Sequence, residues 1–262
     1  MKAMSMESDA RTPRYLGAAF VFQFATSLAA GLLSGPILAG STSEAMASIS
    51  SSLGQMRASI ALFLLTSVGI IVMTSLLYVV LQAQDRAVAL VALGLWMAEA
   101  AMLAVKTLGL YALVDLSVGH VDGAPLAPDR EISGSLSLGF SQHAGQIDML
   151  FFCLGALLWY WLLLRSQIVP RALPLWGLVA VPLVLVNTVL LGWDHSRDPL
   201  TVLYAPYVPF ELVIGLWLLI KGANTPSPHR AYASTPDQNP DLGRRQALTE
   251  GFDGEPGRGS EA

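Results

Sequence analysis

Six long apolar stretches constrain the fold of this chain more than any other feature of its sequence. Each is close to the roughly 20 residues that an α-helix needs to cross a bilayer. They are apolar on all sides, without the alternation of a membrane β-strand, and backbone groups in lipid must be satisfied within the segment. We therefore predict an all-α, polytopic membrane protein, a bundle of six transmembrane helices. The expected spans are residues 15–38, 58–81, 87–114, 147–164, 173–191 and 200–220.

The composition agrees with this class and excludes others. Charged residues make up only 13% of the chain, about half of the roughly 25% typical of soluble domains. The formal net charge of -4 gives no electrostatic reason to expect nucleic acid as a partner. The expected partners are the lipid bilayer and, beyond it, a second copy of the chain or another membrane protein.

The two ends differ from the apolar middle. Residues 1–14 are polar, and the apolar run that follows is longer than the about 7–15 residues of a signal peptide. We therefore expect a retained helix, with cleavage near Ala39 and Gly40 as the alternative. Residues 224–262 are rich in Pro, Gly, Ser, Asp and Arg, which predicts a disordered tail. The six-helix domain is expected over residues 15–223.

Basic residues are distributed unequally between the two sides of the expected membrane. Among the Lys and Arg residues near the membrane, one side carries eight and the other only Arg57, Arg130 and Arg197. Because Lys and Arg concentrate in short cytoplasmic loops, both termini are expected in the cytoplasm, with the chain in the inner (plasma) membrane. The eight are Lys2, Arg11, Arg14, Arg86, Arg165, Arg171, Lys221 and Arg230.

The connections carry further expectations. The longest, Asp115 to Gln146, is expected to be a solvated extracytoplasmic loop, and Ala39 to Met56 a polar outer loop.

The Gly31-x-x-x-Gly35 pair is a weak helix-packing pattern. Aromatic residues near the span ends are typical of membrane-interface belts. These are Trp159, Tyr160, Trp161, Trp193, Tyr204 and Tyr207.

Charged residues inside the spans are the main indication of function, because a charge at mid-bilayer costs about 2.5–3.5 kcal/mol or more. Glu99 lies near the middle of the third span and Glu211 near the middle of the sixth. Their distances from the expected cytoplasmic ends are similar. If these helices pack together, the two carboxyls can share a proton or hold a cation.

Three more polar residues complete this hypothetical intramembrane site. Lys106 lies two helical turns from Glu99, about 10 Å along the axis. Asp148, at the outer end of the fourth span, matches the depth of Lys106 better, and we expect these two to pair. Asn187 in the fifth span adds an amide that needs a partner. Such residues also serve as helix–helix contacts, and this structural role is favoured.

Other signatures of chemistry are weak. The outer segments contain His143, His195 and several acidic residues, but no spacing typical of a metal site. No phosphate-binding loop, nucleophile elbow or dinucleotide fingerprint is present. We therefore expect no metal and no cofactor, and catalytic residues are not assigned.

The second half of the chain resembles a known family. The features that carry the resemblance are Asp148 to Ser166 with the following Pro170-Arg171, and the ending Pro209-Phe-Glu211 to Lys221-Gly222. They are similar to the bacterial domain-of-unknown-function family 4386. The resemblance runs from about residue 14 to 224 and is strongest from Asp148 onward. It implies an integral membrane protein of about six or more helices and no particular activity.

Three functions remain open. The sequence favours a non-catalytic structural or regulatory membrane component. The first alternative is a small ion- or proton-linked transporter that uses the buried carboxylates. The second is a membrane-embedded enzyme with an extracytoplasmic His/Asp site, and an enzyme is the less favoured class.

Overall fold

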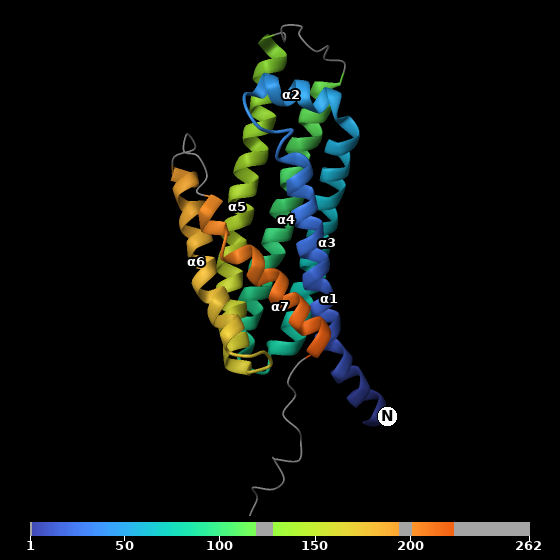
Figure 1. Cartoon of the computed structure of the whole chain (residues 1–262), viewed down its shortest axis with the longest axis vertical. Helices are drawn as coiled ribbons and strands as arrows, with labels where there is room; N and C mark the ends of the chain where they lie inside the picture. The colour runs from blue at the N-terminus through green and yellow to red at the C-terminus, as the bar shows by residue number, and fades with distance from the viewer. Residues whose placement is uncertain (1, 119–127, 194–200, 223–262) are drawn as a thin grey trace, which may run out of the picture. The chain divides into compact units, whose positions relative to one another are not determined.

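The computed structural model describes residues 2–118, 128–193 and 201–222, all of them in the compact unit that ends at Asn224. Every regular element in these residues is helical, which confirms the all-α prediction (Figure 1). The elements are α1 (Lys2–Ser34), α2 (Thr42–Ser51), α3 (Leu53–Leu81), α4 (Arg86–Ser117), α5 (Pro128–Ser166), α6 (Ala172–Trp193), the short 3-10 helix η1 (Thr201–Tyr204) and α7 (Tyr207–Lys221).

Six helical segments are long and apolar enough to cross a membrane, by length and composition. Many of their large apolar side chains point outward. Leu32, Val68, Leu108 and Val179 are each more than half exposed, as expected where lipid replaces water at the surface. The segments are Thr12–Ser34, Leu53–Leu81, Arg86–Ser117, Pro128–Ser166, Ala172–Gly192 and Val202–Lys221.

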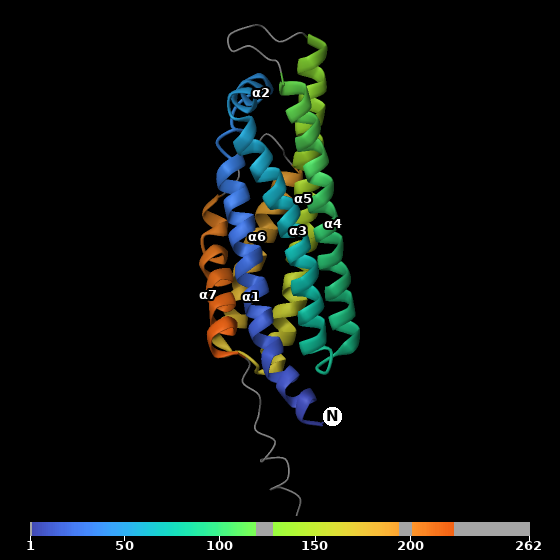
Figure 2. The same cartoon turned by 90° about the vertical axis from the view of Figure 1, so that its right-hand side faces the viewer.

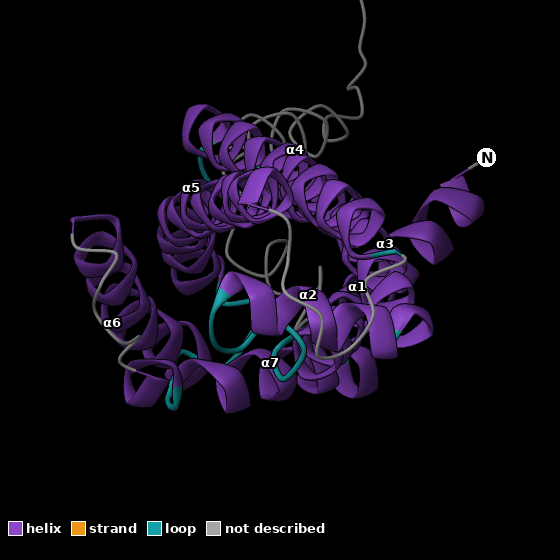
Figure 3. Cartoon of the chain, turned by 90° about the horizontal axis from the view of Figure 1, so that it is seen from above, coloured by secondary structure: helices purple, strands orange, loops and turns teal. Residues whose placement is uncertain are grey.

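The six helices that contain the candidate membrane spans are arranged in a ring. Contacts run from α1 to α3, α4, α5, α6, α7 and back to α1, and the view along the bundle shows this arrangement with α2 over one end (Figure 3). Within the described residues, α1 and α6 do not contact one another. The short α7 therefore closes the ring only along part of its length.

Helix α2 caps the end of the bundle away from the N-terminus (Figures 1 and 2). It begins with a capping box: the Ser41 hydroxyl accepts from Glu44 N–H at 3.3 Å, and Ser41 N–H donates to Glu44 Oε2 at 2.7 Å. This exchange satisfies amide groups that a helix start leaves unpaired. Below it, Met46 packs on Gly134 of α5, where a Cβ would lie 2.6 Å from the methionine sulfur.

The outer connections are more helical than predicted. Most of the expected loop from Asp115 to Gln146 is helix, because α4 continues to Ser117 and α5 begins at Pro128. With 39 residues, α5 is about 58 Å long at 1.5 Å per residue, well beyond a hydrocarbon core of about 30 Å. The expected first outer loop likewise contains α2. Both segments are polar but fold as helices because they pack on neighbouring helices, a contribution that local hydropathy does not report.

The expected aromatic belts are partly wrong. Trp159 and Tyr160 are fully buried and Tyr207 is 7% exposed, so these three rings face the interior of the bundle. Gly31 is exposed and a Cβ there would meet nothing within 4 Å, so the Gly31-x-x-x-Gly35 pattern makes no close helix contact at Gly31. The predicted tail, residues 224–262, lies outside the described residues.

The basic residues follow the predicted division between the two ends of the bundle. Arg57 and Arg130 lie at the end near α2. At the other end, Arg165 stacks on Trp161 with its guanidinium carbon 4.4 Å from the ring centre. Arg14, Arg86, Arg171 and Lys221 lie at that end as well.

Candidate functional site

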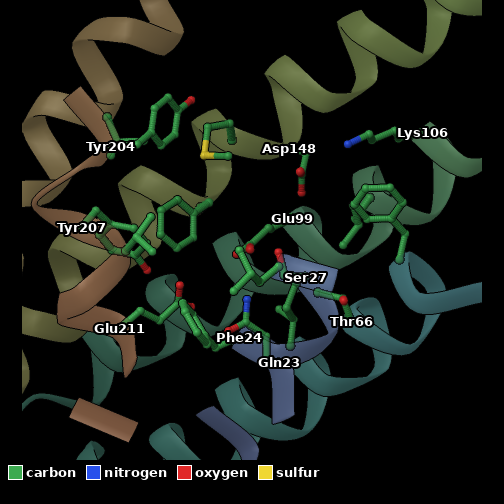
Figure 4. A pocket seen from close by; sticks show the side chains of 18 residues that line it. Gln23, Phe24, Ser27, Thr66, Glu99, Lys106, Asp148, Tyr204, Tyr207 and Glu211 are labelled. Carbon is green, nitrogen blue, oxygen red and sulfur yellow. The ribbon is translucent and has the colours of Figure 1, made fainter. Parts of the chain in front are cut away.

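A partly open cavity of about 230 Å³ lies within the ring (Figure 4). Its walls come from α1, α3, α4, α5, α6, η1 and α7, and they combine acidic, amide, hydroxyl and aromatic side chains. The residues that line it are Gln23, Phe24, Ser27, Leu28, Phe63, Thr66, Ile70, Glu99, Leu103, Lys106, Asp148, Met149, Phe152, Val184, Tyr204, Tyr207, Val208 and Glu211.

Glu99 of α4 lies between the other two carboxyls of this cavity. It is 5% exposed and interacts electrostatically with Asp148 of α5 and with Glu211 of α7. Its Oε2 atom has no hydrogen-bond partner among the described residues. Three acids from three helices thus face one volume, although they are far apart in the sequence.

Glu211 is held by neighbours from two helices. Its carboxyl interacts with the side-chain amide of Gln23 on α1 and with the hydroxyl of Tyr207, one turn earlier on α7. The Tyr207 hydroxyl also lies 3.4 Å from that of Tyr160 on α5. This polar chain joins α1, α5 and α7 at the level of the cavity, and the amide oxygen Oε1 of Gln23 has no partner in the described part of the chain.

The Lys106 ammonium points toward Asp148, whose carboxyl extends toward Glu99 (Figure 4). They interact electrostatically, but no hydrogen bond in the described residues joins them, and the Asp148 Oδ1 atom has no partner there. The Lys106 Nζ atom lies 4.2 Å from the ring centre of Phe63, a cation–π contact. The lysine is therefore placed between an aromatic face and a carboxylate.

Asn187 does not line the cavity but supports a residue that does. Its Nδ2 atom donates to the Tyr204 hydroxyl at 3.3 Å, and Asn187 itself is 1% exposed. The structure therefore brings Glu99, Glu211, Lys106 and Asp148 to one cavity and places Asn187 behind Tyr204.

A second cavity of about 430 Å³ adjoins the first. Phe63, Lys106, Met149 and Tyr204 line both cavities. We call these four residues the neck. The second cavity continues toward the α2 end between residues of α1, α4, α5 and α6, including Ser34, Leu138, Ser141 and Thr188. The neck residues therefore lie between the carboxyl-bearing cavity and a second cavity on its α2 side.

Packed aromatic rings lie on the side of the carboxyls that faces away from the second cavity. Trp96 stacks on Phe152 with ring centres 6.2 Å apart, and Tyr160 packs edge-on against Phe210 at 5.0 Å. Trp96, Trp159, Tyr160 and Phe210 are each at most 1% exposed. We call these four rings the aromatic layer. Along α4 and α5, Trp96 and Trp159 lie nearer than Glu99 and Asp148 to the end of the bundle that carries the N-terminus.

Sequence reasoning missed several lining residues. Gln23 is a polar side chain inside an apolar span, so the cost argument that selected Glu99 also applies to it. The sequence position of Tyr207 predicts an interface belt, because no sequence signal distinguishes a belt tyrosine from one that faces a bundle interior. Ser27 and Thr66 carry little signal, because hydroxyls in membrane helices commonly bond to their own backbone, as Thr66 does to Leu62 O at 2.9 Å.

The described outer His and acidic residues do not assemble into the site that the enzyme hypothesis requires. His143 is exposed on α5 and contacts Gly139 O one turn earlier, and His195 lies outside the described residues. No three His, Cys, Asp or Glu side chains in the described ranges are grouped closely enough to hold a metal ion.

The six apolar helices and the polar cavity inside their ring define the class: a multi-pass helical membrane protein with an internal polar site. Within this class, the chain belongs to the family described as domain of unknown function (DUF4386), whose model matches residues 15–222. This confirms the family resemblance. No curated protein and no solved structure matches the chain.

Proposed function

We infer that this protein is a small ion- or proton-linked membrane carrier whose binding site is the central cavity with Glu99, Asp148 and Glu211. The observation that carries this proposal is the convergence of three carboxyls and Lys106 on one cavity with unpartnered acceptor atoms. Ionisable groups within a membrane are costly and commonly mark ion or proton pathways. Residues that served only as helix contacts would pair with one another and leave no such space.

The shape of the interior supports the same function. A second cavity that shares the neck residues lies on the α2 side of the carboxyls, and packed aromatic rings lie toward the other end of the bundle. A carrier must expose its site to one side of the membrane at a time. In this proposal the structure corresponds to the state open toward α2, and movement of the aromatic layer gives access from the other side.

The orientation in the membrane is part of the proposal. Because the described basic residues are concentrated at the end opposite α2, the positive-inside rule places that end, and both termini, in the cytoplasm of the inner (plasma) membrane. The cavity then opens to the extracytoplasmic side.

The second candidate is a structural or regulatory membrane component. It is favoured by Asn187 and Thr66, whose polar side chains bond to Tyr204 at 3.3 Å and to Thr26 at 2.9 Å within the bundle. In that case the carboxyls would contribute to stability and assembly alone.

Flux measurements separate the two candidates. The purified protein is reconstituted into liposomes that contain a pH-sensitive dye, and gradients of Na⁺, K⁺ or guanidinium are imposed. A carrier moves protons in response to at least one of these gradients, and Glu211→Gln and Glu99→Gln abolish the response. Glu131→Gln, which changes an exposed glutamate outside the cavity, should leave it intact.

A structural component gives a different pattern. The wild-type protein then behaves like empty liposomes in every gradient, and Glu211→Gln changes only the stability of the protein in detergent. This result would overturn the carrier proposal.

A further inference from the structure

We propose that the central cavity binds a small organic cation through a primary ammonium group. This inference rests on the proposed function for the role of the site, but it concerns the ligand alone. It is argued from the hydrogen-bonding atoms, the aromatic walls and the spacing of the carboxyls.

The unpartnered polar atoms of the cavity are all acceptors. Among the described residues, five buried side-chain polar atoms lack a hydrogen-bond partner, and three of these belong to cavity-lining residues: Gln23 Oε1, Glu99 Oε2 and Asp148 Oδ1. Their side chains are 6%, 5% and 9% exposed. A buried acceptor without a donor is destabilising, so the ligand that completes this site must supply donors. A primary ammonium carries three N–H donors and no acceptor.

Lys106 shows that the cavity accepts such a group. Its own ammonium lies 4.2 Å from the centre of the Phe63 ring and interacts with Asp148. The deeper part of the cavity repeats this arrangement, with the Glu99 and Glu211 carboxyls and with Phe152 and Tyr207 as aromatic walls. A ligand ammonium fits there as a second cation beside Glu99 and Glu211, because Lys106 faces only Asp148.

The spacing of the carboxyls argues for an organic cation over a bare metal ion. Divalent metals need several ligand atoms at about 2.0–2.6 Å from one point, and no three acidic or other ligating side chains in the described ranges are grouped in that way. The carboxyls instead surround a volume of about 230 Å³.

Apolar side chains complete the cavity and indicate that the ligand has an apolar body beside its ammonium group. Leu28, Ile70, Leu103 and Val208 lie among the polar residues, so the body of the ligand is a short hydrocarbon. Lys106 lines the same cavity as the proposed ligand. Because like charges repel, Lys106 weakens the binding of every cation and disfavours those with more than one charge.

Binding to the purified wild-type protein in detergent tests the inference without any substitution. We expect butylammonium to bind and to raise the thermal unfolding midpoint. Butan-1-ol has the same body without the charge, and tetramethylammonium has the charge without N–H donors; both should bind at least about tenfold more weakly. Equal binding of the three probes, or binding of none, would overturn the proposal.

Variants then locate the ligand. Glu99→Gln should weaken butylammonium binding about tenfold or more, Lys106→Met should strengthen it, and Glu131→Gln should not change it. Unchanged affinity in Glu99→Gln, in protein whose thermal unfolding remains cooperative, would place the ligand elsewhere and overturn the proposal.

The two proposals fail in distinguishable ways. Butylammonium binding without cation-linked flux in liposomes would overturn the carrier and leave the ammonium site standing. Proton flux that Glu211→Gln abolishes, without butylammonium binding, would overturn the ammonium site and leave the carrier standing.

Discussion

The indole Nε1–H of Trp96 donates a 3.1 Å hydrogen bond to the carbonyl oxygen of Phe152. Trp96 lies one turn from Glu99 on α4, and Phe152 lies one turn from Asp148 on α5. This bond therefore fixes the relative position of the two helices beside two of the three cavity carboxyls. Gly155 makes the contact possible, because a Cβ at that position would overlap the Trp96 indole.

Replacing Trp96 by Phe should lower the free energy of unfolding by about 1 kcal/mol more than the same change at Trp159. Both tryptophans are fully buried, so the loss of volume is matched. Only Trp96 loses a hydrogen bond, worth about 0.5–1.5 kcal/mol, whereas Trp159 Nε1 has no partner in the described residues. Unfolding in mixed detergent micelles measures both values. Equal losses would show that the bond to Phe152 contributes nothing.

Gly17 should be far more sensitive to substitution than Gly31. A Cβ on Gly17 would lie 2.7 Å from the backbone carbonyl carbon of Leu218 on α7, so Gly17→Ala must separate α1 from α7 and destabilise the protein by about 1–3 kcal/mol. A Cβ on Gly31 meets nothing within 4 Å. Gly31→Ala is the matched control and should be neutral or slightly stabilising. The reverse order of thermal unfolding midpoints would contradict the helix crossing seen here.

The start of α2 should loosen in acid. The backbone N–H and hydroxyl of Ser41 donate to Glu44 and hold the pKa of its carboxyl below the ordinary 4.5. A lowered folded-state pKa means that the stabilisation is complete above about pH 4.5 and is lost as the pH falls through the lower, folded value. Glu44 should therefore protect the α2 amides from hydrogen exchange at neutral pH, and this protection should be lost in acid.

The control for this effect is Glu44→Gln, which cannot titrate. At neutral pH its α2 amides should exchange faster than those of the wild type, and the difference should shrink as the pH is lowered. A constant difference between the two proteins at every pH would mean that the Glu44 charge is irrelevant to the cap.

Single-cysteine labelling should report the orientation of the bundle. The native Cys153 is fully buried, so it should not react, and Cys153→Ala provides the background. Ser51 at the end of α2 and Gln84 between α3 and α4 are exposed at opposite ends. With both termini in the cytoplasm, a membrane-impermeant maleimide labels Ser51→Cys in intact cells and Gln84→Cys only after permeabilisation. The opposite pattern would invert the proposed orientation.

The sequence alone determined the helices and the polar residues within them. Hydropathy is a local property and the bilayer sets the length of a span, so six helices followed from the apolar runs. The cost of a charge in lipid selected Glu99 and Glu211, and the structure places both on one cavity. The same cost applies to Gln23, which the sequence analysis overlooked.

The tertiary structure alone decided which side of each helix faces inward. These spans are apolar on every side, so no periodic pattern fixes their rotation; contacts between helices do so. Those contacts close the ring of α1, α3, α4, α5, α6 and α7, turn Tyr207 from the expected interface to the cavity, and extend α5 to Pro128 through packing on α4 and α2. The cavity itself exists only because residues distant in sequence meet, a property that no single segment carries.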